Sequence, residues 1–124
     1  MAKNQFKCDC NAVNHDSVCR ARANMPDNEA IERLSAFYKM IGDVTRCKLL
    51  LSLMTGEMCV CDLANSLSMT KSSISHQLNN MLAKGIVKRR RDGKEVYYSL
   101  DDEHVSGIIA TSLEHIRHKS EEHQ

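Results

Sequence analysis

Apolar residues after position 26 recur at steps of three and four, the spacing that places side chains on one face of a helix. One such set follows Asp27, a residue type that caps helix N-termini, and stops at Gly42. Its members are Ile31, Leu34, Phe37, Tyr38 and Ile41. A second set lies between a further cap, Asp43, and Gly56, and consists of Val44, Cys47, Leu50, Leu51 and Met54. The pattern predicts two amphipathic helices with these residues facing the core.

The next segments are shorter and are separated by turn residues. Residues 60–67 are predicted to form a short helix, followed by the tight connection Ser68-Met69-Thr70. Thr70 can cap a second helix over residues 71–83, which Gly85 ends. The residues of this helix that face the core are expected to be Ile74, Leu78, Met81 and Leu82.

Residues 86–91 and 95–100 are predicted to pair as a β-hairpin, with Asp92-Gly93 as its turn, because this dipeptide favours two-residue turns. Asp101 or Asp102 then caps a last helix that runs to about Lys119. Residues 1–26 show neither a helical nor a strand period. The expected organisation is a flexible cysteine-bearing arm (1–26), one DNA-binding and dimerisation domain (27–119) and a tail (120–124).

A short helix, a tight turn, a longer helix and a basic hairpin follow one another in the order of a winged helix-turn-helix. The predicted fold class is therefore mainly α with a β-hairpin wing, and homodimeric, because one chain presents one recognition helix and a two-fold dimer reads adjacent major grooves. Considered separately, the second helix also fits a solvated polar helix, and the hairpin also fits an ordinary charged hairpin.

Charge is distributed unevenly, although 17 basic and 16 acidic residues give a net charge of only +1. Residues 71–91 contain no acid and six Lys or Arg, a local basic face of the kind that binds DNA. On the second helix, the side chains expected to meet bases and phosphates are Lys71, Ser72, Ser73, Ser75, His76, Gln77 and Asn79. On the hairpin, those expected to meet flanking backbone are Arg90, Arg91 and Lys94.

The 124 residues, 42% of them hydrophobic and 4% aromatic, fit one helix-rich domain with an aliphatic core. No apolar run approaches the roughly 20 residues that cross a bilayer, and the N-terminus has no apolar signal region. A cytoplasmic location without a membrane partner is therefore expected. In that reducing compartment the six cysteines are better explained as thiols or metal ligands than as disulfides.

Cys59-Val60-Cys61 lies at the start of the first helix of the predicted helix-turn-helix, residues 60–67. There the helix dipole favours the thiolate form of cysteine, which is the form that binds metal. Two sulfurs cannot complete a tetrahedral site, so Cys8 and Cys10 of the arm are the expected further ligands. Cys19 is a possible substitute, and Cys47 follows the apolar stripe of its helix. A thiol redox switch and a purely structural zinc site remain alternatives. No nucleophile, base and orienting group indicate an enzyme.

The last helix carries His115 and His118 at i and i+3, and His104 eleven residues before His115. At about 1.5 Å per residue, His104 and His115 lie roughly 16 Å apart along the axis, too far to share one ion. Two antiparallel copies can pair Asp102 and His104 of one with His115 and His118 of the other. The apolar residues that support a buried dimer face are Val105, Ile108, Ile109, Leu113 and Ile116. The alternative is a polar helix end with incidental histidines.

The assembled motifs resemble the ArsR/SmtB family of metal-sensing repressors over roughly residues 28–119. The matching segments are residues 42–46 (GDVTR), 57–64 (EMCVCDLA), 70–78 (TKSSISHQL) and 93–100 (GKEVYYSL). The resemblance implies a homodimeric winged helix that binds operator DNA, represses an efflux or sequestration operon, and dissociates when metal binds. Cys-Val-Cys-Asp-Leu alone does not separate arsenic(III) sensors from cadmium/lead sensors.

The arm cysteines together with Asp102, His104 and His115 resemble the cadmium/lead/zinc branch of the family, which can carry a thiolate site and a last-helix site. This implies Cd(II) or Pb(II) at the thiolates and Zn(II) at the last helix, in agreement with the preference of soft metals for sulfur. The chain departs from the branch at His118, where glutamate is frequent, and in its closely spaced arm pair Cys8-Asp9-Cys10.

Overall fold

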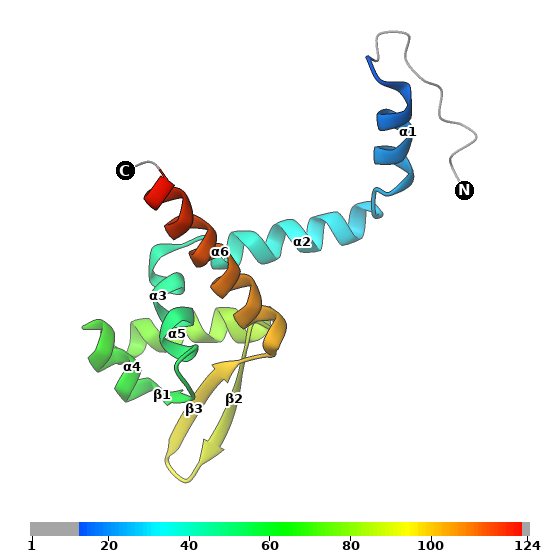
Figure 1. The fold of residues 1–124 in the computed structure, drawn as a ribbon. Helices are drawn as coiled ribbons and strands as arrows, with labels where there is room; N and C mark the ends of the chain where they lie inside the picture. The colour runs from blue at the N-terminus through cyan, green and yellow to red at the C-terminus, as the bar shows by residue number, and fades with distance from the viewer. Residues whose placement is uncertain (1–12, 123–124) are drawn as a thin grey trace. The chain divides into compact units, whose positions relative to one another are not determined.

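The computed structural model describes residues 13–122. The chain divides into two compact units, with the boundary between Ala36 and Phe37. The elements in chain order (Figure 1) are α1 (His15–Ala23), α2 (Asn28–Ile41), α3 (Val44–Leu53), β1 (Met58–Cys59), α4 (Val60–Leu67), α5 (Lys71–Ala83), β2 (Val87–Asp92), β3 (Glu95–Leu100) and α6 (Glu103–Glu122).

Helix α1 lies within the segment for which the sequence predicted no regular structure, and that prediction is wrong for residues 15–23. The helix buries no residue and has no apolar stripe to detect. It is stabilised locally: the side chain of Asn14 accepts a hydrogen bond from the backbone N–H of Ser17 at 3.0 Å, and Arg20 donates to the hydroxyl of Ser17 at 3.2 Å. Such a helix leaves no hydrophobic period in the sequence.

The predicted caps of the next helices are confirmed. Asp27 accepts a hydrogen bond from the N–H of Ala30 at 2.9 Å, and Asp43 accepts one from the N–H of Arg46 at 3.0 Å. Helix α2 ends at Ile41, next to Gly42. A Cβ atom at Gly42 would lie 3.0 Å from the carbonyl oxygen of Tyr38, so the close approach of the backbone favours glycine there.

The core of the second unit lies between α3, α4, α5 and the sheet. Its most buried members are Leu49, Leu50, Leu53, Leu63, Ile74, Leu78, Met81, Ile86, Val87 and Tyr98. The inward face predicted for α3 is wrong in part: Val44, Leu51 and Met54 are 73%, 38% and 36% exposed, whereas Leu49 and Leu53 are buried. Because residues 49–51 are consecutive leucines, apolar spacing alone does not select a face. Contacts with α4 and β3 select it.

Helices α4 and α5 form the predicted helix-turn-helix, joined through Ser68 in the left-handed conformation (φ 55°). Thr70 caps α5 as predicted, because its hydroxyl accepts a hydrogen bond from the N–H of Ser73 at 3.1 Å. The side chains of Ile74, Leu78 and Met81 are fully buried, which confirms the inner face of α5.

We expect Thr70→Ala to lower the free energy of unfolding by about 1 kcal/mol, since the N–H of Ser73 loses its acceptor. Thr70→Ser, which keeps the hydroxyl, is the matched control and should stay close to the wild type. Urea unfolding of the three proteins at one concentration measures the effect. Equal stability of the alanine and threonine proteins would contradict the role of the cap.

The sheet has the strand order β1-β3-β2, and both pairs are antiparallel. Asp92 pairs with Glu95, so the two-residue turn is Gly93-Lys94 and the predicted turn, Asp92-Gly93, is off by one residue. The left-handed φ of 63° at Gly93, the first of the two turn residues, is what glycine permits. The hairpin projects beyond the helices of its unit (Figure 1).

Strand β1 was not predicted, because two residues are too few to show an alternating pattern. Helix α6 begins after Asp102, whose carboxylate accepts hydrogen bonds from the N–H groups of His104 and Val105 at 2.9 and 3.1 Å. The helix continues three residues past the predicted end, to Glu122. No helix in residues 13–122 combines the length and the apolar character of a membrane span. The predicted fold class, mainly α with a hairpin wing, is confirmed.

Candidate DNA interface and thiolate site

The outer face of α5 carries the polar residues predicted to read DNA. Lys71, Ser72, His76 and Asn79 are exposed, and Ser73, Ser75 and Gln77 are partly buried. Their positions follow from the inner face of the helix: because Ile74, Leu78 and Met81 are buried, the residues between them point outward. The helix also directs its N-terminus, a favourable position for a phosphate, toward solvent at the exposed cap Thr70.

Gln77 has a second role that the sequence did not indicate. Its side-chain oxygen accepts a hydrogen bond from the Nε of Arg46 at 2.9 Å, and Arg46 also donates to the carbonyl oxygen of Met40 at 3.1 Å. Arg46 of α3 therefore connects α5, the recognition helix, to α3 and to the end of α2. Its place in the segment Gly42-Asp43-Val44-Thr45-Arg46, which matched the family resemblance, was the available signal.

The wing carries Arg89, Arg90, Arg91 and Lys94 in exposed positions. Arg90 differs from the others, because its Nε and Nη2 donate to the two carboxylate oxygens of Glu57 at 3.0 and 2.6 Å. This contact lowers the pKa of Glu57 and raises that of Arg90. Within residues 13–122, Arg91 and Lys94 form no ion pair, so their charges are available to a partner.

Cys59 and Cys61 lie where β1 passes into α4. Cys59 occupies the N-cap position and is 6% exposed, and its side chain makes no capping hydrogen bond. Cys61 lies in the first turn of the helix and is partly exposed. Pairing of Cys59 with Tyr97 of β3 holds this segment against the sheet.

Lys71, predicted from the sequence as a DNA contact, also lies beside the thiols. The pKa of Lys71 is raised above its ordinary value, chiefly by a hydrogen bond with Cys61 and then by the electrostatic influence of the same group. The first residue of α5 is therefore electrostatically coupled to Cys61, one of the predicted metal ligands in the first turn of α4.

The thiol pair has the chemistry of a soft-metal site but supplies only two of the four donors of a tetrahedral site. In the part of the chain that the structure describes, no three His, Cys, Asp or Glu side chains converge. The other predicted ligands, Cys8 and Cys10, lie outside the described residues. The residues present fit a site that is completed by donors from elsewhere.

The two remaining described cysteines have different surroundings. The thiol of Cys47 is partly buried and donates to the carbonyl oxygen of Ile41 at 3.1 Å, as expected of a structural thiol. In the first unit, the sulfur of Cys19 lies 3.9 Å from the Nδ1 of His15, one helical turn away on α1.

In α6 the predicted ligands form two separate groups. Asp102 and His104 are neighbours, with Oδ2 and Nδ1 3.3 Å apart, and hydrogen bonds from the N–H of Val105 and from His104 lower the pKa of Asp102. His115 and His118 lie exposed farther along the helix. A single chain does not bring the two groups together.

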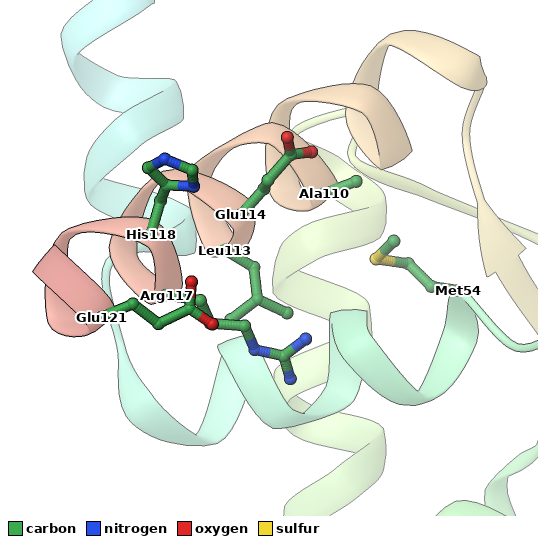
Figure 2. Close-up of a pocket in the computed structure, with 7 residues that line it drawn as sticks. All are labelled: Met54, Ala110, Leu113, Glu114, Arg117, His118 and Glu121. Carbon is green, nitrogen blue, oxygen red and sulfur yellow. The ribbon is translucent and has the colours of Figure 1, made fainter.

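A pocket of about 440 Å³ lies at the second group (Figure 2). Figure 2 shows Met54, the residue that directly follows α3, on one side of the pocket, and Leu113, Glu114, Arg117 and His118 of α6 on the other. Ile116 on the same helix is 60% exposed, and Met54, which lines the pocket together with His118, is 36% exposed. Apolar side chains are therefore partly exposed to solvent at this end of α6.

Comparison with known proteins gives consistent matches. The family model for the bacterial regulatory proteins of the arsR family matches residues 43–89. The cadmium resistance transcriptional regulatory protein CadC homolog of Staphylococcus aureus is 36% identical over 111 residues, which are 89% of this chain and 91% of that protein. The transcriptional repressor SmtB homolog of Synechocystis is 32% identical over 110 residues, which are 89% of this chain and 83% of that protein.

Among solved structures, the homodimeric winged helix-turn-helix DNA-binding domain of Mb0332 from Mycobacterium bovis, a possible ArsR-family transcriptional regulator, superposes with a TM-score of 0.70. It is 25% identical, and the match covers 82% of this chain and 95% of that domain.

Proposed function

Since the chain belongs to the ArsR/SmtB family of bacterial regulatory proteins, we propose that it is a metal-sensing repressor whose metal-free dimer binds operator DNA and releases it on capture of Cd(II), Pb(II) or Zn(II). The family membership establishes a transcriptional repressor with a DNA-binding winged helix and confirms that the chain is not an enzyme. The proposal adds the inducing ions, the release and the regulated process, metal efflux or resistance. It places the protein in the cytoplasm, with its operator.

The observation that carries the proposal is the position of the two thiols. Cys59 and Cys61 flank the start of α4, and Cys61 is near enough to raise the pKa of Lys71, the first residue of the recognition helix α5. Thiolate sulfur prefers soft ions such as Cd(II) and Pb(II). An ion held there, with Cys8 and Cys10 as the proposed further ligands, therefore acts directly on the helix-turn-helix.

For DNA reading, the proposal uses the outer face of α5 and the tip of the wing. Ser72, His76 and Asn79 are exposed and are proposed to contact base edges and phosphates. Lys71, Ser73, Ser75 and Gln77 belong to the same proposed set of DNA contacts. Arg91 and Lys94 supply phosphate contacts that flank the recognition helix. Arg90 belongs to the same strand, and its ion pair with Glu57 sets it apart.

The dimer is proposed from the last helix. Val105 and Ile109 of α6 pack against the core of their own chain, whereas Ile116 is exposed and Ile108 and Leu113 are only partly buried, so the described chain covers the apolar side of α6 incompletely. The homodimeric domain of Mb0332 has the same fold. A two-fold pair of α6 helices would bring Asp102 and His104 to His115 and His118 of the other copy, a donor set that suits Zn(II).

The test is a metal titration of the operator complex. We expect about 5- to 150-fold weaker operator binding with saturating Cd(II), the range of a coupling free energy of about 1–3 kcal/mol. Fluorescence anisotropy with a labelled fragment from upstream of the regulated operon measures the dissociation constant at fixed salt, because salt alone changes it. Sedimentation of the same sample checks the dimer. Unchanged affinity with both Cd(II) and Zn(II) contradicts metal sensing, and a monomer contradicts the last-helix site.

A further inference from the structure

Three residues from the three strands form one row across the sheet. Cys59 of β1 pairs with Tyr97 of β3, and Tyr97 pairs with Arg90 of β2. Directly paired residues of antiparallel strands place their side chains on the same face. A proposed metal ligand, an aromatic ring and a wing arginine therefore share one face of the sheet.

Glu57 makes a side-chain contact with the arginine of this row. It lies two residues before Cys59 in the chain, and its carboxylate holds Arg90 in a two-pronged contact at 2.6 and 3.0 Å. The guanidinium of Arg90 also lies 4.9 Å from the centre of the Tyr97 ring. The contact thus passes over the middle strand and joins the segment of the thiols to the outer strand of the wing.

Arg90 differs from a typical phosphate-binding arginine, because its donors are already directed at protein groups. Nε and Nη2 bond to Glu57, and Nη1 lies 3.6 Å from a carboxylate oxygen of Asp92. A planar guanidinium that binds a carboxylate through two nitrogens and lies over an aromatic ring has a fixed orientation. The contribution of such a half-exposed pair to stability is small, so its effect is expected in geometry.

We propose that Glu57 and Arg90 are positioning residues that fasten the wing to the segment carrying Cys59 and Cys61, so that metal capture by the thiols displaces the wing as well as the recognition helix. The inference rests on the proposed function and names the route by which the metal site acts on one DNA-binding element. It assigns Arg90 to this contact, and Arg91 and Lys94 to the phosphates.

The physical reason is the shortness of β1. Within residues 13–122 the strand has two residues and pairs with β3 alone, so its backbone hydrogen bonds hold it only weakly against the sheet. An ion bound by Cys59 and Cys61 would draw the two thiols together and would shift Glu57, which lies two residues before Cys59. The carboxylate then either carries Arg90 along or releases it, and both results change where the wing meets DNA.

The experiment compares the cadmium response of the full-length wild type with that of Glu57→Gln and Arg90→Gln. The response is the ratio of operator dissociation constants with and without saturating Cd(II), measured by anisotropy. We expect each variant to lower this ratio by about 2- to 30-fold, the range for residues that couple two sites. The double variant should lower it no further than either single one, and the exchanged pair Glu57→Arg/Arg90→Glu should recover part of it.

Arg91→Ala is the matched control on the same strand. It should weaken operator binding and reduce the dependence of affinity on salt by about one phosphate contact, while its cadmium ratio stays at the wild-type value. A second readout is the affinity for Cd(II) itself, followed by the sulfur-to-metal absorption band with and without operator. Thermodynamic linkage requires that operator lowers the affinity for Cd(II) by the same factor by which Cd(II) lowers the affinity for operator.

The outcomes separate the two proposals. A wild type whose operator affinity responds to neither Cd(II) nor Zn(II) contradicts the proposed function and this inference with it. A wild type that responds to Zn(II) but not to Cd(II) overturns this inference alone. A responsive wild type together with Glu57→Gln and Arg90→Gln proteins of equal response overturns this inference alone. A ratio that falls equally in Arg91→Ala also overturns it, because the effect then follows any lost wing charge.

Discussion

Replacing both Cys59 and Cys61 by serine is expected to remove the response of operator affinity to Cd(II), from a factor of about 5 to 150 in the wild type to a factor near one. The two thiols lie at the start of α4, the helix that precedes the recognition helix α5, and Cys61 raises the pKa of Lys71 in the first turn of α5. Serine keeps the size of the side chain but offers a hydroxyl, which binds Cd(II) far more weakly than a thiolate does.

Anisotropy with labelled operator measures the response, and ultraviolet absorption measures the sulfur-to-cadmium band, which should disappear in the same variant. Because Cys59 is 6% exposed and lies in the sheet, Cys61→Ser alone provides a second variant at the more accessible thiol. Cys47→Ser is the matched control, since that thiol bonds to the carbonyl oxygen of Ile41. A full cadmium response in the double variant would place the sensing ion elsewhere, with the last helix as the next candidate.

Leu49→Ala is expected to lower the free energy of unfolding by about 2–5 kcal/mol, the range for a leucine that leaves a cavity in a packed core. Leu49 is fully buried and packs in the core cluster with helix α4 and the sheet. For a domain whose total stability is about 5–15 kcal/mol, the loss is large enough to deplete the folded protein.

Leu51→Ala is the matched control: the same substitution, two residues away on the same helix, at a side chain that is 38% exposed. It should cost less than half as much. Guanidinium unfolding followed by circular dichroism compares the two at one protein concentration, because dimerisation makes stability depend on concentration. An equal or larger loss for Leu51→Ala would show that the inner face of α3 is turned toward Leu51 and away from Leu49.

Leu49 and Leu51 show which features of the fold the sequence pattern alone does not predict. The caps Asp27, Asp43 and Thr70 were predicted correctly, because a cap depends on a hydrogen bond between residues three apart. The inner face of α5 was also predicted correctly, since polar residues separate Ile74, Leu78 and Met81 from one another. The leucines at 49–51 have no polar residue between them, and only packing against α4 and β3 decides which of them is buried.

In the hairpin, too, one feature was predicted from the local sequence and another was decided by long-range pairing. Two strands flanking the dipeptide Asp92-Gly93 were predicted to pair, and the paired strands are present. The turn is displaced by one residue, because the pairing of Asp92 with Glu95 fixes the register and leaves Gly93 and Lys94 between the strands. The sequence favoured Asp-Gly as a local unit, whereas the ladder of cross-strand pairs determines which residues turn.

By itself, the sequence determined the family, the order of the helix-turn-helix and wing, and the presence of two thiols at the start of a helix. Each depends on residues close together in the chain, where spacing and local hydrogen bonds decide the structure. Tertiary structure alone decided that Cys59, Tyr97 and Arg90 share one row, and that Glu57 holds an arginine 33 residues away. Strand register and long-range packing create those contacts, and a local sequence pattern carries no record of them.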